Sequence, residues 1–293
     1  MIDAFKPSYL EHASYLKSLT EKYEHGELDM GIGHWRGVEV LFNGKSNTIA
    51  IFCKDGSDGY DSGSLGFVRG LVWLESFGKV GRFIIDSLIN FPRLLKGHEL
   101  LRTGNIPLNR LYKFDIAIKR HVGKKKNIDF IYFGELDRVG HKYGTKSPEI
   151  INAVRKIDKK ISEMDFDLIF SDHGMADVEK LVKVPLSKNC FIDSDMARYW
   201  GKENEMITIR NRLPLEDGEI IDWPDKRFGD LVFLAKTGNL IFPNFWDKKP
   251  VKGMHGYDGK HKDMKAFYIL KKAGERRDLE VEEIHEKIFG NRR

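Results

Sequence analysis

The sequence predicts an α/β fold in which helices flank a mostly parallel central sheet. Apolar runs at residues 128–133 and 166–170 are typical of buried strands, and a helical pattern over 148–164 lies between them. This strand–helix–strand order is typical of parallel strands joined by a crossover helix. Acidic and histidine residues follow both strands, and ligand groups gather at the carboxyl ends of strands in such sheets. We therefore expect a functional site at this edge of the sheet.

The length and composition indicate how the domain is organised. With 293 residues, 41% of them hydrophobic, the chain can bury a large core. We predict a single α/β domain over residues 1–293. A helical insertion or lid is expected at about 55–125, and an irregular subdomain that contains four prolines at about 200–250.

Further elements are expected from apolar spacing along the chain. Pro148 is a good first helical residue behind the N-cap Ser147. The region 68–95 is apolar and partly amphipathic; we expect a helical lid packed on the domain, with a membrane-surface contact as the disfavoured alternative. The other expected helices are at 8–23, 38–44, 111–122, 195–200 and 280–289, and the other expected strands are at 47–53, 190–192, 231–235, 239–242 and 265–270.

Composition and charge exclude several functional classes. The net charge of +5 is spread along the chain, so no nucleic-acid polymer is expected as a partner. The start of the chain does not resemble a signal peptide, and the widely spaced Cys53 and Cys190 fit free thiols in a reducing compartment, so we expect a cytoplasmic protein. Charged residues make up 32% of the chain and glutamine is absent, which is typical of a thermophile.

Three polar stretches carry side chains that bind metals. The letters SDHGM at 171–175 place an Asp and a His directly after the second strand, and DRVGHKYG at 137–144 follows the first strand as a glycine-punctuated loop. The letters GMHGYDG at 253–259 form another glycine-rich loop, with His255 near its centre. Because neutral imidazoles and carboxylates are ligands of zinc and related divalent ions, these stretches together predict a metal site.

Four motifs in order resemble the alkaline phosphatase superfamily, specifically its type I phosphodiesterase/nucleotide pyrophosphatase branch. Asp3, in the letters IDAFKP, matches the first metal-binding loop of that family, and the three stretches above match the later ones. The letters DMKA at 263–266 and a strand follow His255, as in the family. The resemblance spans nearly the whole chain and implies an alkaline phosphatase-like fold.

The resemblance also implies a pair of divalent metal ions, usually zinc, with manganese as an alternative that Asp/His sites accept. Such a pair clamps the attacking and leaving oxygens of an in-line displacement at phosphorus. Carried over residue by residue, the implied ligands are Asp137, His141 and His255 for one ion and Asp3, Asp172 and His173 for the other.

The nucleophile position departs from the family pattern. The family places a Thr or Ser at the entrance of a helix, and counting back from Gly44 puts this position at His34. No Ser or Thr lies between Thr20 and Ser46. Three interpretations stay open: His34 is a nucleophile, it is a metal ligand beside an activated water, or it marks a protein that has lost hydrolysis. If the match is misplaced, Ser46 or Thr48 takes the role.

The first strand is the second departure. Asp3 needs a strand to aim it into the site, and only two residues precede it. Either the natural start lies upstream, or the fold has lost this strand. In the second case the second metal position is weakened and the sheet has an unpaired edge or gap.

The favoured hypothesis is a metal-dependent hydrolase of phosphoric esters, of the phosphodiesterase/nucleotide pyrophosphatase type. Its substrate would be a phosphorylated small molecule, a nucleotide or a phosphodiester. One alternative is a non-catalytic, metal-holding protein that binds a phosphorylated ligand. Another is a phosphoryl transferase that acts on a sugar or lipid acceptor, with residues 68–95 as a membrane-proximal lid. The sequence decides neither the substrate nor the oligomeric state.

Overall fold

The fold of this computed structural model is described over residues 1–33, 37, 40–41, 131, 133–187, 190–223, 229–244, 247 and 249–290. The expected insertion at 55–125 lies outside the described residues, as do the expected strand at 47–53 and the expected helices at 68–95 and 111–122. His34, Ser46, Thr48 and Cys53 lie outside them too, and only part of the expected helix at 38–44 lies within them.

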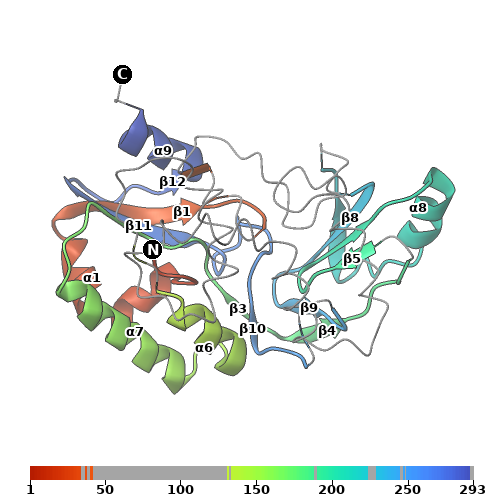
Figure 1. The fold of residues 1–293 in the computed structure, drawn as a ribbon, viewed down its shortest axis with the longest axis horizontal. Coiled ribbons are helices and arrows are strands. Elements are labelled where there is room, and N and C mark those ends of the chain that lie inside the picture. The colour runs from red at the N-terminus through yellow and green to blue at the C-terminus, as the bar shows by residue number, and fades with distance from the viewer. Residues whose placement is uncertain are drawn as a thin grey trace, which may run out of the picture.

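The central sheet has the strand order β12–β1–β11–β2 (Figure 1). Strand β11 (Ala266–Ala273) runs antiparallel to β1 (Tyr23–Asp29) and to β2 (Leu168–Phe170), so β1 and β2 are parallel to each other. Strand β12 (Leu279–Glu280) pairs with β1 in parallel. The sheet is therefore mixed, in an α/β arrangement.

The first residues of the chain extend this sheet beyond β2. The backbone N–H of Ile2 donates to the carbonyl of Phe170 at 2.9 Å, and Ile2 forms a parallel bridge with Phe133. The N–H of Asp3 donates to the Phe133 carbonyl at 2.9 Å. Within the described residues, the chain before Asp3 is thus held between two neighbouring segments, and the sheet shows no gap there.

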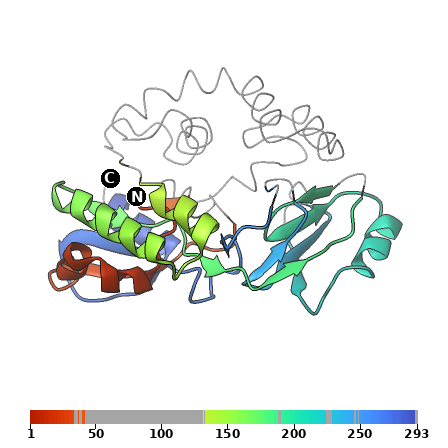
Figure 2. The same ribbon diagram turned by 90° about the horizontal axis from the view of Figure 1, so that it is seen from below.

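Helices cover both faces of the sheet (Figure 1), and those of the lower face lie in front in the view from below (Figure 2). One face carries the 3₁₀-helix η1 (Pro7–His12), α1 (Ser14–Leu19), α6 (Glu135–Tyr143) and α7 (Pro148–Ser162), and the other carries α9 (Val281–Phe289). Strand β11 shows why both faces are covered, because Phe267 and Ile269 pack towards α1 and α7 while Tyr268 packs towards α9. Successive strand residues point to opposite faces, and each large apolar side chain buried there stabilises the fold by about 1.5–3 kcal/mol.

A second lobe is built on an antiparallel sheet with the strand order β5–β6–β8–β7 (Figure 1). Its strands are β5 (Cys190–Ile192), β6 (Met196–Tyr199), β7 (Gly218–Ile221) and β8 (Leu231–Ala235), and helix α8 (Glu203–Arg210) precedes β7. Two short pairs join β3 (Ala176–Asp177) with β10 (Gly253–Met254) and β4 (Lys180–Val182) with β9 (Asn239–Ile241), and β9 shares the core of the second lobe. Cys190 is buried, and its Sγ donates to the Ser187 carbonyl at 3.0 Å.

Several expected elements are confirmed. The expected helices at 148–164 and 280–289 correspond to α7 and α9, and the expected strands correspond to β2, β5, β8, β9 and β11. Ser147 caps α7, since its Oγ accepts a hydrogen bond from the backbone of Ile150 at 3.2 Å. In the part of the chain that the structure describes, no helix has both the length and the apolar character that a membrane crossing requires.

Three other expectations are wrong. The helix expected at 195–200 is strand β6, whose four residues are all buried between β5 and β8; a short apolar run does not distinguish the two structures by periodicity. The helix expected at 8–23 is interrupted at Ala13 (φ −119°) and ends at Leu19. The loop expected at 137–144 is mostly helix α6.

Candidate metal centre

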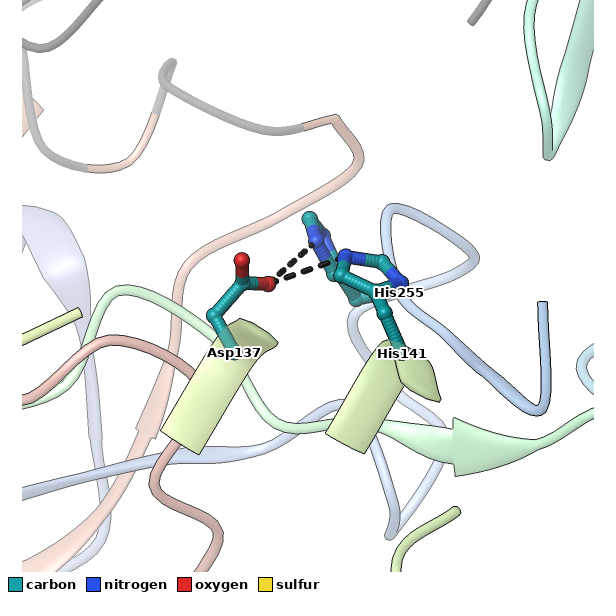
Figure 3. A group of neighbouring side chains, drawn as sticks. All are labelled: Asp137, His141 and His255. Atoms are coloured by element: carbon teal, nitrogen blue, oxygen red, sulfur yellow. Dashed lines mark ion pairs between the residues drawn. The ribbon is translucent and has the colours of Figure 1, made fainter. Parts of the chain in front are cut away.

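Asp137, His141 and His255 form the first cluster of possible ligands, here named the outer group (Figure 3). Asp137 and His141 lie one turn apart on α6, so their side chains project from the same helix face. His255 follows β10 and reaches the same point from a loop. Oδ1 of Asp137 is 3.0 Å from Nε2 of His141 and 3.1 Å from Nε2 of His255.

The carboxylate of Asp137 is the centre of this group. Its Oδ1 is buried, and two imidazole nitrogens lie close to it. Among the described residues, neither contact has the geometry of a hydrogen bond. Burial raises the pKa of Asp137, but the neighbouring His141 and His255 outweigh it and hold this pKa well below its usual range. A carboxylate and two imidazoles that converge on one point match the donor set of a zinc site.

The orientation of His141 is set by a contact on its other side. Its Nδ1 lies 2.8 Å from the carbonyl of Gly253, and this contact is a hydrogen bond when Nδ1 carries the proton. The lone pair of Nε2 then points towards Asp137. Histidines that bind metals are held by such outer contacts, which fix the tautomer and the ring orientation.

Asp3, Asp172 and His173 form the second cluster, here named the inner group, and all three are buried. Nε2 of His173 lies 3.5 Å from an oxygen of each aspartate. Nδ1 of His173 faces the carbonyl of Gly174 at 2.8 Å, and Oδ1 of Asp172 accepts a hydrogen bond from the Ala4 backbone at 3.2 Å. Burial raises the pKa of Asp172. Two buried carboxylates beside one imidazole are a donor set that a divalent cation would neutralise.

The backbone around Asp3 is shaped for this position. Its N–H is fixed to the Phe133 carbonyl, as described above, and the next residue, Ala4, has a positive φ of 58°. A residue with a side chain seldom takes this conformation, and such outliers are concentrated at functional sites. The turn brings the Ala4 N–H to Asp172 and thereby links two members of the inner group.

The two groups adjoin each other. The imidazole rings of His173 and His255 are stacked, with centroids 3.7 Å apart and an interplanar angle of 12°. The rings of His141 and His255 have centroids 5.0 Å apart. The six residues that the resemblance implied as ligands are therefore brought together, in the same two sets of three. Their role as ligands stays a prediction.

Glycines in the motifs allow this convergence because they permit close packing. A Cβ on Gly140 would lie 2.3 Å from Sδ of Met175, and one on Gly253 would lie 2.6 Å from the Gly140 carbonyl oxygen. A Cβ on Gly174 would lie 2.1 Å from the Asp263 carbonyl oxygen. The segments that carry His141, His173 and His255 therefore touch at positions where only a hydrogen fits.

Sequence reasoning gave no role to several residues that hold the site together. Oγ of Ser171 donates to the Phe5 carbonyl at 2.7 Å and accepts from the Phe267 backbone at 2.8 Å, so it joins three segments behind the inner group. Nζ of Lys6 contacts Asp263 at 3.0 Å and Thr145 at 3.3 Å. Ser171 belongs to the SDHGM motif and Lys6 to the IDAFKP motif. This membership was the only indication in the sequence that either residue matters to the site.

His34 lies outside the described residues, but the residue before it is placed. The N–H of Gly33 donates to the Gly256 carbonyl at 3.2 Å, directly after His255 in the sequence. Asp29 shapes this approach, because its Oδ1 accepts from the Gly31 N–H at 2.8 Å and its Oδ2 pairs with Lys265 at 2.6 Å.

Known proteins resemble this chain in sequence and in fold. A sequence profile of the type I phosphodiesterase/nucleotide pyrophosphatase family matches residues 108–212. Human ectonucleotide pyrophosphatase/phosphodiesterase family member 7 is 26% identical over 190 residues, a match that covers 52% of this chain and only 41% of that protein.

Solved structures of ectonucleotide pyrophosphatase/phosphodiesterase 5 share the fold. The human protein has a TM-score of 0.64 at 17% identity, and the mouse protein has a TM-score of 0.64 at 13% identity. An inactive variant of the mouse protein in complex with AMP has a TM-score of 0.62 at 13% identity. Each match covers 98% of this chain and 92% of the other.

The resemblance to the nucleotide pyrophosphatase branch of the alkaline phosphatase superfamily is confirmed. The predicted α/β class is confirmed with it: the chain has an alkaline phosphatase-like fold. The described central sheet is mixed and not mostly parallel, because β11 runs antiparallel to both of its neighbours. Within this fold, the residues of the outer group lie on α6 and on the loop after β10. The residues of the inner group lie after the C-terminal end of β2 and in the adjacent chain start. The two groups are the described clusters of three His, Cys, Asp or Glu residues that can hold a metal ion.

Proposed function

We propose that this protein is a metal-dependent hydrolase of phosphoric esters, of the phosphodiesterase/nucleotide pyrophosphatase type. The observation that carries the proposal is the stacking of His173 on His255 at 3.7 Å, because it sets two metal-binding groups side by side. A pair of metal sites this close is suited to an in-line displacement at phosphorus. The match to a family named for this chemistry supports the proposal.

In this proposal, Asp137, His141 and His255 hold one divalent ion and Asp3, Asp172 and His173 hold the other. When bound, the ions would polarise the phosphoryl oxygens and neutralise charge that develops in the transition state. We favour zinc, and manganese is the alternative.

The chain's own residues orient this chemistry. The carbonyls of Gly253 and Gly174 fix the histidine tautomers, so that Nε2 of His141 and of His173 face the carboxylates. The Ala4 N–H occupies one oxygen of Asp172 and leaves the other directed at His173. The burial of the inner group excludes water from one side of the reacting centre, which strengthens electrostatic interactions there.

We propose His34 as the candidate catalytic residue of this site, because counting back from Gly44 puts the family's nucleophile position there. His34 lies outside the described residues; the preceding Gly33 is bonded to Gly256, next to His255. As a nucleophile, His34 would form a P–N bond through a ring nitrogen while the P–O bond to the leaving group breaks on the opposite side of phosphorus. Water would then cleave the P–N bond and release the phosphoryl product. As a ligand or a remnant, it would not form that bond.

The substrate class is a phosphodiester or nucleotide. The AMP complex of the mouse structural neighbour supports a nucleotide, and the names of the sequence relatives support a diester. The cytoplasmic location and the thermal adaptation stay predictions from composition alone.

The proposal is tested by measuring metal content together with hydrolysis of bis-p-nitrophenyl phosphate. We expect about two metal ions per chain and metal-dependent hydrolysis. His34→Ala should abolish activity if His34 is the nucleophile, and activity that survives this change would assign attack to an activated water or to another residue. His12→Ala is the matched control, since His12 lies in η1, away from the described groups. Two bound ions without hydrolysis of any phosphoester would favour the binding protein, and no bound ion would overturn the proposal.

A further inference from the structure

Lys6 is a buried cation that no part of the proposed chemistry uses. The residue is only 7% exposed. Nζ contacts Oδ1 of Asp263 at 3.0 Å and Oγ1 of Thr145 at 3.3 Å, and it lies 5.5 Å from the centre of the Tyr9 ring. Burying an ammonium is costly unless it is paired, so this position needs an explanation.

The three segments that Lys6 joins are those that carry the possible ligands. Lys6 itself follows Asp3 by three residues, after the strained turn at Ala4. Thr145 follows the end of α6, which carries His141. Asp263 lies on the segment that runs from His255 to β11.

Asp263 also touches the remaining part of the inner group through its backbone. Its carbonyl oxygen packs against Gly174, where an added Cβ would lie only 2.1 Å away, and the neighbouring Met264 carbonyl accepts the Gly174 N–H at 2.9 Å. Gly174 directly follows His173. The contacts therefore close a ring that runs from Asp3 through Lys6 and Asp263 to His173, and back through Asp172 and Ala4.

We propose that Lys6 is a positioning residue for metal binding, whose ion pair with Asp263 holds Asp3 and His173 at the separation that the inner group requires. This inference rests on the proposed metal site. Replacing a buried ion pair by apolar residues of similar volume often leaves the stability of the fold unchanged. The Lys6–Asp263 pair is therefore better explained by its effect on how the three segments are positioned than by a contribution to stability. Loss of such outer support weakens metal binding by about 10–100-fold.

The test isolates the inner group. His141→Ala removes one ligand of the outer group, and in this background zinc is titrated into metal-free protein against a chromophoric chelator. Adding Lys6→Met and Asp263→Leu together should raise the zinc Kd by about 10–100-fold. The midpoint of thermal unfolding should stay close to that of the parent. Lys6→Arg, which keeps a cation opposite Asp263, should restore most of the affinity.

The matched control is the pair formed by Glu24 and Lys287, which is also largely buried but lies between β1 and α9. Changing it to Glu24→Leu and Lys287→Met should leave the zinc Kd unchanged. Should the Lys6 double variant not fold, Asp263→Asn keeps the volume and removes only the charge, and it should still weaken zinc binding.

Two results would overturn the inference in different ways. A zinc Kd within twofold of the parent in the folded Lys6 variants would refute the positioning role and leave the proposed function intact. Failure of the wild-type chain to bind zinc at all would refute the metal site itself, and the positioning role with it.

Discussion

The outer and inner groups use the same residue types in different surroundings. The outer group has two histidines and one aspartate, and its Asp137 and His141 side chains are 20% and 26% exposed. The inner group has two aspartates and one histidine, and its Asp172 side chain is 1% exposed. The inner group therefore carries more negative charge with less water around it. We infer that a metal ion bound at the outer group exchanges readily with the solvent. Release of an ion from the inner group depends on opening of the surrounding fold.

The largest expected effect is that of removing a ligand from either group. Asp137→Ala and Asp172→Ala should each lower hydrolysis of bis-p-nitrophenyl phosphate at least about 100-fold, since even outer contacts of metal ligands change activity by up to that amount. Metal content should fall from two ions per chain towards one. If Asp137→Ala retained both ions and full activity, the outer group would not be a metal site.

A chelator should remove the metal ions from the two groups at different rates. Treatment with excess EDTA is expected to remove one ion quickly, from the more exposed outer group, and the second more slowly. Metal content at successive times after desalting measures this. In the His141→Ala protein only the slow phase should remain. Loss of both ions in a single fast phase would contradict the difference in burial.

Glycine substitutions test how rigidly each group is supported. Gly174→Ala forces a Cβ against the backbone oxygen of Asp263 and should destabilise the fold by about 1–3 kcal/mol. Gly140→Ala meets the end of the flexible Met175 side chain and should cost less. Urea unfolding measures the loss of unfolding free energy in each variant. Equal losses would contradict the expectation that the backbone beside the inner group is held more rigidly.

The smallest effect is expected from a buried acid outside both groups. Asp158 of α7 accepts hydrogen bonds from the N–H groups of Leu16 at 2.8 Å and Tyr15 at 3.0 Å, and so caps α1 from another helix. Asp158→Ala should reduce the free energy of unfolding by about 1–2 kcal/mol, with metal content unchanged. The exposed Asp165 serves as control, because Asp165→Ala should change stability by less than about 0.5 kcal/mol.

The sequence predicted the residues of the site better than their local structure. Clusters of Asp, His and Gly are visible in the letters, and four such motifs in order are sufficient to choose a family. The helical conformation of 135–143 was not visible, because Gly140 is typical of a loop. In the structure Gly140 is needed for contact with Met175 and Gly253, so a glycine with a packing role was interpreted as flexibility.

Strand β1 was not predicted for a related reason. Its letters YEHGELD contain three acidic residues and a glycine, which argue against a buried strand. Glu24 and Asp29 are buried there because Lys287 and Lys265, distant in sequence, pair with them. Lys6 was missed in the same way, since its importance arises only from the meeting of three segments. Local patterns carry no information about such partners.

The paired metal site is tested most directly by crystallography, using anomalous scattering at the zinc edge from crystals of the zinc-loaded protein. We expect two anomalous peaks. One should lie about 2.0–2.2 Å from donor atoms of Asp137, His141 and His255, and the other at the same range from Asp3, Asp172 and His173. The absence of a peak at either group, or peaks bound by other residues, would contradict the paired site on which the proposed function depends.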